Sequence, residues 1–586
     1  MPFADTSLRD EYAAAVERVA GRVLDALRGA AGPAAPDRPG GSTPDGPPTG
    51  PPAEPPLLEG SLPRAELAAV RVLGPDVFAP RLLHGLAPDR PTVLAAALAL
   101  KAFPAPADGA AGDPSASAAA ASWRDRATLD LLALGGHVAS ASRPAPRPGP
   151  PLAPVPEPDR LGWPRWSVAM ARLSPLALPE LGGPVHDLAR RHSLALARGA
   201  TRSMMRRDLR TAARIARWLA WTVASGAPEH LEVAPSSTGS APPVTEVPGS
   251  HSKSPSPRAC WPSGRTERPH DRHHRHDRPA QRPTGLLGRA ALAALLLPER
   301  ARALPRGRDH RPGRPRQRLQ AAGEAALATG LLLREGVAGA EDSRIARETL
   351  DLAWEQLRGG DLLYERQLRY PLMTDPLEVY VHFARADYRH RALEELLDSL
   401  ARLRAVQAME MLPNRRLAVA NARRVVGLEQ RPDWSALAAA TWLGATPEPW
   451  MIDWLTAYDV THTVFHLTDW GARPDGLPAP MRDYLRDWLP VWLDVWQEIG
   501  QWDLVGELLI VAACIGEAEV GIPGWLALAA AQRPDGLVPR DADPVADEPE
   551  QLLTDHGHTA VVTVVAAAIT LARALGGASG ATAVAA

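Results

Sequence analysis

Apolar residues recur at helical spacing through most of the C-terminal half of the chain, from about residue 319 to residue 577. Gly or Pro stands in most of the short intervals between these apolar runs, and no run shows the strict alternation that is typical of a half-buried strand. The pattern predicts an all-α domain of about eleven helices, or about five to six helical hairpins, over 319–577 and a flexible tail at 578–586.

The N-terminal half carries shorter patterns with more interruptions. Residues 1–30 predict one amphipathic helix, and residues 31–59 are rich in Pro and Gly and predict a linker. Residues 60–228 predict a smaller helical region with Pro-rich interruptions. Within it, we expect the segment from Leu188 to Val223 to form one long helix or two, with Arg on the outer face.

Residues 229–318 show neither helical nor strand periodicity and are rich in Arg, Pro and His. The stretch 251–320 holds 17 Lys or Arg against 5 Asp or Glu. A disordered linker explains this composition, and so does a GC-rich gene that is read out of frame in this stretch. A third interpretation is a basic tail for nucleic acid or a His-rich metal-binding tract.

Composition excludes several classes of protein. The net charge of −2 gives no electrostatic reason to expect nucleic acid or a membrane as a partner. With Cys260 and Cys514 as the two cysteines, a disulfide scaffold and a zinc site of several thiolates are excluded. The first residues lack the apolar stretch of a signal peptide, and no run reaches the ~18 consecutive apolar residues of a membrane span. We expect a cytoplasmic protein and assign it no cofactor.

The segment 526–570 carries a second architectural signal. A helix ends at Gln532, a Pro534-Asp535-Gly536 turn and an extended arm follow, and a helix led by His and Thr comes next. This order resembles the repeating hairpins of α/α-toroid enzymes such as terpene cyclases, lanthionine cyclases and six-hairpin glycosidases. The resemblance is close over 500–577 and extends to 321–500 by helix rhythm. It implies a ring of hairpins around a central cavity, although one fold hosts many chemistries.

Four motifs narrow the resemblance further. The stretches "THTVFHLTDWG", "WDLVGELL", "AAQRPDGLVP" and "PLEVYVHFARADYRH" are similar to an uncharacterised actinobacterial family that is defined only as a domain of unknown function. This resemblance implies a C-terminal helical domain of about 250–300 residues without an assigned activity.

The stretch "YDVTHTVFHLTDWG" places two histidines and two aspartates among aromatic residues. We expect a helix over 448–470 with Asp469 in its last turn, and at 100° per residue Tyr458, His462 and Asp469 fall on one face of it. His462 and Asp469 are separated by two turns and cannot share a hydrogen bond, because each residue adds about 1.5 Å along the axis. His466 can contact both of them, because it lies four residues after His462 and three residues before Asp469.

A metal site is one interpretation of this stretch. His462 and His466 have the i, i+4 spacing that zinc-binding helices use. The third ligand would come from Asp469, His556 or His558. Against this interpretation, Thr463 stands where the zinc motif H-E-x-x-H carries Glu.

The chemistries of the toroid enzymes are only partly supported by the residues. A lanthionine cyclase needs two cysteines as zinc ligands, and only Cys514 lies in this domain. The Asp-rich motif of terpene cyclases is absent. A glycosidase needs two carboxylates at a set separation, which sequence does not provide. Such carboxylates could come from Asp469, Asp503, Glu507 or Asp535.

Residues 500–516 predict a helix that is apolar almost all round and therefore buried. Asp503 and Glu507 share its remaining stripe, which suits the inner wall of a ring whose cavity they would face. The alternative is that Asp503 caps the helix and Glu507 reaches an Arg. His556 and His558 lie at the start of a later helix, where the helix dipole favours a neutral imidazole.

Two functional hypotheses follow from these observations. The first is an acid–base enzyme that acts on a small molecule or modified peptide in specialised metabolism. The second is a non-catalytic helical scaffold or binding module, whose tryptophan-rich surface contacts a partner protein. A single pocket around the acidic residues would favour the enzyme, and acidic residues scattered to helix seams with Arg partners would favour the scaffold. The catalytic candidates are His462, Asp469, Asp503 and Glu507, the ligand-binding candidates are Tyr458, His466, Asp535 and His558, and no metal ligand is assigned.

Overall fold

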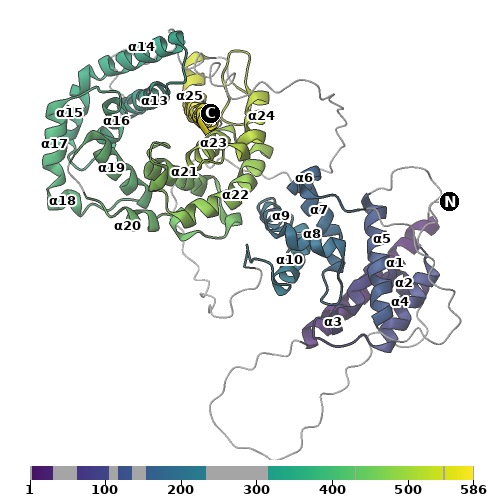
Figure 1. The fold of residues 1–586 in the computed structure, drawn as a ribbon. Coiled ribbons are helices and arrows are strands. Elements are labelled where there is room, and N and C mark those ends of the chain that lie inside the picture. Colours follow the sequence, from purple (N-terminus) through teal and green to yellow (C-terminus); the bar gives the residue numbers. More distant parts are fainter. Residues whose placement is uncertain are drawn as a thin grey trace, which may run out of the picture.

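The computed structural model describes residues 3–30, 63–104, 116–134, 154–232, 314–428, 431–545 and 548–584. These residues form α-helices, short 3-10 helices and loops, and no strand occurs among them, so the predicted all-α class is confirmed. The predicted linker at 31–59 and most of the Arg/Pro/His-rich segment, from 233 to 313, lie outside the described residues. Figure 1 shows the helices along the chain.

The N-terminal half consists of helices of 4 to 28 residues that pack against one another. Their bounds are α1 Phe3–Ala30, α2 Arg64–Leu73, α3 Ala79–Leu82, α4 Arg90–Ala102, α5 Ala116–Leu134, α6 Pro158–Leu161, α7 Trp163–Arg172, α8 Pro184–Arg191, α9 Ser193–Met205 and α10 Leu209–Ala224. The 3-10 helices η1 Gly74–Phe78 and η2 Ser174–Leu176 connect some of them. The carboxylate of Asp89 caps α4 by accepting from the Thr92 amide at 2.8 Å.

The segment from Leu188 to Val223 is divided more finely than the sequence indicated. It contains the end of α8, all of α9 and most of α10, rather than one helix or two. The chain leaves the helical conformation at His192, and Arg207 adopts a left-handed φ of 60°. Asp208 then caps α10 through the Thr211 amide at 3.1 Å. These local breaks are side-chain and turn features that the apolar periodicity does not reveal.

The C-terminal half contains longer helices, drawn from teal to yellow in Figure 1. Their bounds are α13 Arg314–Glu335, α14 Ala340–Gln356, α15 Asp361–Arg369, α16 Asp375–Ala384, α17 Arg391–Ala401, α18 Arg404–Gln407, α19 Pro413–Val426, α20 Trp434–Ala439, α21 Trp454–Thr468, α22 Ala479–Glu498, α23 Trp502–Ile515, α24 Ile522–Ala531 and α25 Pro549–Val584. The 3-10 helices η3 Arg358–Gly360, η4 Leu443–Ala445, η5 Pro449–Met451, η6 Pro474–Gly476 and η7 Ala518–Gly521 lie between them. Helix α25 runs through most of the stretch 578–586 where the sequence predicted a tail.

Six of these helices form a closed cycle of contacts. Helix α13 packs on α16, α16 on α19, α19 on α21, α21 on α23, α23 on α25, and α25 returns to α13. Helices α14, α15, α22 and α24 pack against members of this cycle. In Figure 1 the six helices follow one another around the C-terminal half, with α14, α15 and α22 at its periphery. Residues far apart in the sequence are thereby brought together inside the cycle.

Helices α23 and α25 are buried on nearly all sides. Most residues of α23 are buried, as the apolar pattern of residues 500–516 predicts. Among the described residues, one helical segment, Thr554–Leu575 in α25, is long and apolar enough to cross a membrane. Because 67% of its apolar window is buried inside the fold, this composition is weak evidence for a membrane span.

The two halves of the chain meet where α9 packs against α22. Arg198 donates to the carbonyl oxygen of Asp487 at 2.8 Å. Arg202 pairs with the carboxylates of Asp494 and Glu498, at 2.5 and 3.0 Å. The Arg-rich face predicted for this part of the N-terminal half thus contacts the acidic face of α22, outside the cycle of six helices.

Candidate functional site

A cavity of about 480 Å³ lies within the cycle of six helices, and each of the six contributes side chains to its wall. This volume falls within the roughly 300–1,000 Å³ that small-molecule sites occupy. Much of the wall is apolar and includes Leu327, Val381, Phe465, Trp470, Ile510 and Val561. The polar part of the wall includes Glu324, His382, Arg385, His462, His466, Glu507 and His558.

Helix α21 places several of these side chains. It begins at Trp454, because Asp453 and Thr456 form a reciprocal capping box, with the Asp453 carboxylate accepting from the Thr456 amide at 2.8 Å. It ends at Thr468, and Asp469 adopts a left-handed φ of 49°. The predicted helix over 448–470 is therefore too long at its start, and Asp469 caps α21 instead of lying in its last turn.

One polar cluster surrounds Glu507 on α23. We call it the Glu507 cluster, and it comprises Glu324, Tyr458, Thr461, His462, Asp503, Glu507, His558 and Thr559. The Glu507 carboxylate is 1% exposed and accepts a hydrogen bond from the Thr461 hydroxyl. Its Oε1 lies 3.7 Å from Nε2 of His462 and 3.5 Å from Nε2 of His558. Both imidazoles line the cavity and are about half exposed to it.

Asp503 lies one turn before Glu507 and completes the acidic side of the cluster. Its carboxylate accepts from the Tyr458 hydroxyl and, at 2.9 Å, from the Thr559 hydroxyl. Nε2 of His558 lies 4.0 Å away. Asp503 does not serve as the helix cap, and no guanidinium contacts Asp503 or Glu507 among the described residues. Histidines and hydroxyls therefore hold both acids.

Charges within the cluster set its protonation. Burial would raise the pKa of Glu507, but the His462 charge and hydrogen bonds from His462 and His558 lower it overall. Burial would lower the pKa of His462, but the Glu507 carboxylate raises it. The same opposition acts at His558, where contacts with Glu324 and Glu507 and the charge of Asp503 raise the pKa to about 11. At neutral pH the cluster thus holds an ionised Glu507 beside a protonated His558, and the Glu507 carboxylate favours the protonated form of His462.

Two further groups of the cluster, Asp503 and Tyr458, also have raised pKa values. Burial raises the pKa of Asp503, and the neighbouring Glu507 charge adds to the rise. Burial and the Asp503 charge raise the pKa of Tyr458. Tyr458 therefore remains a hydroxyl donor throughout the physiological range.

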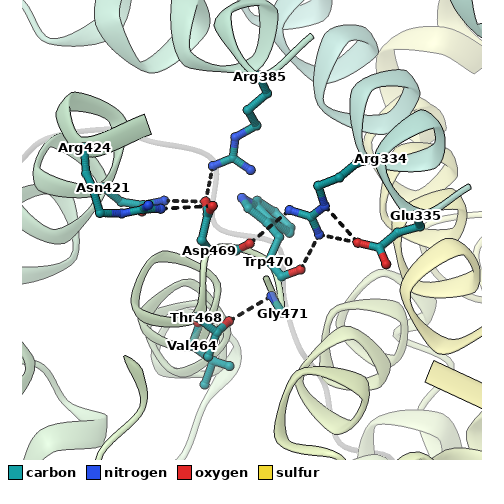
Figure 2. Close-up of polar contacts among 10 residues, drawn as sticks. All are labelled: Arg334, Glu335, Arg385, Asn421, Arg424, Val464, Thr468, Asp469, Trp470 and Gly471. Atoms are coloured by element: carbon teal, nitrogen blue, oxygen red, sulfur yellow. Dashed lines mark hydrogen bonds and ion pairs between the residues drawn. The ribbon is translucent and has the colours of Figure 1, made fainter. Parts of the chain in front are cut away.

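A second polar cluster surrounds Asp469 at the end of α21 (Figure 2). We call it the Asp469 cluster, and it comprises Arg334, Arg385, Asn421, Arg424 and Asp469. The Asp469 carboxylate accepts from Arg385, from Asn421 at 3.1 Å and from Arg424 at 3.0 Å. Burial would raise the pKa of Asp469, but Arg385, Asn421 and Arg424 lower it overall. This carboxylate is ionised and fully engaged with cations, and the cavity wall does not include it.

The Asp469 cluster also fixes a strained turn. Asp469, Trp470 and Gly471 have φ values of 49°, 56° and 80°. Arg334 holds this conformation by donating to the carbonyl oxygens of Asp469 and Trp470, at 3.1 and 2.7 Å (Figure 2). The Trp470 ring stacks on Phe465, with ring centroids 4.4 Å apart, and both rings line the cavity. A left-handed conformation costs about 1–3 kcal/mol for each non-glycine residue. The contacts with the arginines offset this cost, and they thereby fix the position of the Trp470 ring.

Two further histidines lie along the cavity without joining either cluster. Burial lowers the pKa of His466 to about 3, and the His462 charge adds to the effect. Burial and the Arg385 charge lower the pKa of His382 to about 3. Both imidazoles are therefore neutral at physiological pH. The His462 and His466 rings are 6.1 Å apart at their centroids and meet edge to face.

The Glu507 cluster could also hold a divalent cation. Ligand atoms of Asp503, Glu507 and His558 lie within 4.8 Å of one another. Carboxylates and an imidazole suit zinc or a similar ion, which would have to displace the His558 proton. The ligand set considered from sequence is different, because His466 lies outside this group. His556 is also committed, since its Nδ1 accepts from the Arg540 amide at 3.0 Å.

The structure brings most of the predicted site residues to one side of the cavity. His462, Glu507 and His558 line it, and Tyr458 and Asp503 support them from behind. His466 also lines the cavity, whereas the Asp469 carboxylate is engaged behind the wall. Asp535 lies in an exposed turn away from the cavity, where its carboxylate accepts from the Leu537 amide at 3.1 Å.

Sequence reasoning missed several residues of the wall. Glu324 on α13 contacts Nδ1 of His558 at 3.2 Å, and Arg385 follows α16 at the opposite part of the wall. These residues are remote in sequence from the stretch 458–471, so no local pattern connects them to it. The i, i+3 spacing of His382 and Arg385 within "VYVHFARADYRH" was the one signal that could have found them.

Comparison with known proteins supports a domain assignment for the C-terminal half. Residues 289–568 match a family described as a domain of unknown function, DUF6895. No match was found among curated proteins. No match was found among solved structures. The matched range contains the six helices of the cycle up to residue 568 and every residue of the cavity wall.

Proposed function

We propose that the C-terminal domain is an acid–base enzyme that acts on a small molecule or modified peptide of specialised metabolism inside the cavity. The observation that carries this proposal is the Glu507 cluster. A buried carboxylate that no guanidinium contacts in the described part of the chain lies against two imidazoles that face a cavity of small-molecule size. Groups with opposed and strongly shifted protonation are typical of acid–base sites.

The roles follow from the geometry. Protonated His462 donates its proton to an atom of the bound ligand, and Glu507 stabilises the imidazolium from 3.7 Å. His558 and the Thr461 hydroxyl hold the Glu507 carboxylate in place. A ligand that fills the cavity displaces water from beside the apolar wall and so strengthens these electrostatic contacts. Asp469 is left out of the proton transfer, because three side chains engage its carboxylate.

We test this proposal with the full chain in D₂O and a small-molecule extract of the cells from which it comes. The expected result is that wild-type protein converts or deuterates at least one compound, as mass spectrometry would detect. Glu507→Gln should lower this rate about a hundredfold or more, because the His462 imidazolium loses its counter-charge. Glu341→Gln, on the exposed face of α14, is the matched control and should leave the rate unchanged.

The alternative is a non-catalytic binding module for a partner protein. Of the eleven tryptophans between Trp354 and Trp525, Trp454 is the one that is exposed, so the tryptophans do not make the broad surface that this alternative needs. Trp454 does lie beside Met451 and Leu455, which are 64% and 55% exposed. Identical behaviour of wild type and Glu507→Gln in D₂O would contradict the enzyme and favour a contact through this exposed patch.

We further infer that the cycle of six helices is a toroid-like array of hairpins, and that the protein is cytoplasmic and of actinobacterial origin. The closed order of helix contacts and the cavity inside it support the toroid-like architecture. Burial of the segment Thr554–Leu575 is consistent with the location. The likeness of the four sequence motifs to an actinobacterial family supports the origin.

A further inference from the structure

We propose that Arg385 binds the anionic head group, carboxylate or phosphate, of an amphipathic ligand whose apolar body fills the cavity. The inference rests on the proposed function for the existence of a ligand, and it adds the chemical class of that ligand. It is carried by the charge balance of the Asp469 cluster and by hydrogen-bond donors that the fold leaves unused.

The charges around Asp469 do not balance. Arg385 and Arg424 both contact the single Asp469 carboxylate, and Arg334 is paired with Glu335. Two guanidiniums therefore share one carboxylate, and of the two Arg385 is the buried one, at 9% exposed against 32% for Arg424. Buried charges are normally paired, so this surplus indicates a missing anion.

Arg385 also has hydrogen-bond donors that the described residues leave unused. Its side chain is only 9% exposed, and one nitrogen donates to Asp469. The Nε and Nη1 atoms have no hydrogen-bond partner in the described part of the chain, and the same is true of Nδ1 of His382. In Figure 2 the guanidinium of Arg385 reaches Asp469 at one end, and its other end makes no drawn contact. Buried donors are nearly always satisfied, and each exception calls for a partner.

Arg385 and His382 border the cavity, and their unused donor atoms are covered by protein atoms next to it. Both belong to the cavity wall, and their i, i+3 spacing at the end of α16 puts them on one face. The other guanidinium of the wall, that of Arg415, is paired with Glu378 at 3.0 Å. Arg385 is thus the wall cation with donors to spare, and a planar guanidinium suits carboxylate and phosphate oxygens.

The rest of the cavity defines the body of the ligand. Phe465 and Trp470 form a stacked aromatic wall beside the Asp469 cluster, and aliphatic side chains of α16, α23 and α25 continue the surface. Burial lowers the pKa of Arg385 to about 10, and the charges of Arg334 and Arg424 contribute. The guanidinium remains charged at neutral pH. An anion at Arg385 with an apolar chain directed toward the Glu507 cluster satisfies both the donors and the wall.

The test is isothermal titration calorimetry on the full chain with three probes of similar apolar chain length: octanoate, octyl phosphate and the neutral octanamide. Wild type should bind octanoate or octyl phosphate at least about tenfold more tightly than octanamide, because a charge-assisted contact is made only by the anions. The two anionic probes distinguish a carboxylate from a phosphate head group. Equal affinity for all three probes, or binding of none, would overturn the proposal.

Variants assign the preference to Arg385. Arg385→Gln should reduce the affinity for the anions to that for octanamide. Arg415→Gln is the matched control, because Arg415 is the other arginine of the cavity wall but is paired with Glu378, and it should retain the preference. Glu507→Gln should also retain it while losing proton transfer, so the two proposals fail separately. An Arg385→Gln protein that still prefers the anions would overturn the assignment.

A second measurement covers the case in which Arg385→Gln does not fold. The side-chain ¹⁵Nε resonance of Arg385 in wild type, assigned through its absence in Arg385→Lys, should shift when octanoate or octyl phosphate is added. Octanamide should leave that resonance in place. An Arg385 resonance that does not respond to the anions would contradict the proposal.

Discussion

The Glu507 cluster and the Asp469 cluster both involve helix α21, since Glu507 on α23 contacts its middle and Asp469 caps its end, but they are built from different partners. Thr461, His462 and His558 contact Glu507, whereas arginines and an amide contact Asp469. Imidazole changes its charge near neutral pH and guanidinium does not. The first cluster can therefore exchange protons, and the second can only hold charge in place.

The position along α21 explains the division. Glu507 faces the middle of the helix, where the backbone is satisfied and side chains alone line the cavity. Asp469 lies where the helix ends and the chain turns through left-handed residues, whose carbonyl oxygens need donors. Arginines supply these donors and the counter-charge together. A buried acid is therefore a candidate for proton transfer when imidazoles contact it, and a structural group when guanidiniums contact it.

The largest effect is expected from Asp469→Ala. Removing the carboxylate leaves Arg385 and Arg424 without their shared partner and releases the strained turn. We expect a loss of about 3 kcal/mol in the free energy of unfolding, measured by urea denaturation of the full chain. Asp469→Asn should cost less, because Asn tolerates a left-handed φ and keeps an acceptor oxygen. A loss below about 1 kcal/mol for Asp469→Ala would show that the cluster does not hold the turn.

A matched pair of Thr→Val substitutions tests the charge on Glu507. The Thr461 hydroxyl donates to the Glu507 carboxylate, whereas the buried Thr563 hydroxyl donates to the neutral Thr559 carbonyl oxygen at 2.7 Å. We expect Thr461→Val to cost about 2 kcal/mol and Thr563→Val about 1 kcal/mol in unfolding free energy, because a hydrogen bond to a charged group contributes more. Equal costs would contradict the view that an ionised Glu507 depends on Thr461.

The helical class could be predicted from the sequence because helical periodicity is a local property. The limits of α21 could be predicted only in part. Its start follows from the local capping box of Asp453 and Thr456, which is visible in the sequence, although the prediction began the helix at residue 448. Its end at Thr468 depends on Arg334 and Arg385, which approach from other helices and leave no trace in the stretch 458–471.

The candidate site shows the same limit. The apolar pattern of α23 isolated Asp503 and Glu507 on one stripe, but it left open whether Glu507 reaches an Arg or faces a cavity. The residues that contact Glu507 come from α21 and α25, so their proximity is a consequence of tertiary packing. The dipole argument predicted neutral imidazoles for His556 and His558. Burial does lower the pKa of His556, whereas the neighbouring carboxylates raise that of His558.

Substitutions of two glycines test how closely other side chains pack on the turn that follows α21. Gly471 and Gly516 have similar φ values of 80° and 83°. A Cβ at Gly471 would lie 3.1 Å from Nη2 of Arg573, whereas a Cβ at Gly516 would meet nothing within 4 Å. Gly516→Ala should cost about 1 kcal/mol through backbone strain, and Gly471→Ala about 1 kcal/mol more, because Arg573 must shift. Equal losses in urea denaturation would show that the turn has room to spare.

The smallest effect is expected from the pH dependence of the Glu507 cluster, because the His558 imidazole is nearly half exposed and solvent screens its contacts. The pKa of His558 rises from the ordinary 6.5 to about 11 in the folded protein. A raised pKa stabilises the fold fully below pH 6.5, and this contribution is lost as the pH rises through about 11. Glu324→Gln removes one source of the rise, so the unfolding free energy should fall less steeply between these values than in wild type. Imidazole NMR titration, with His558→Asn for assignment, checks the cause, and a His558 signal that titrates near 6.5 in wild type would contradict it.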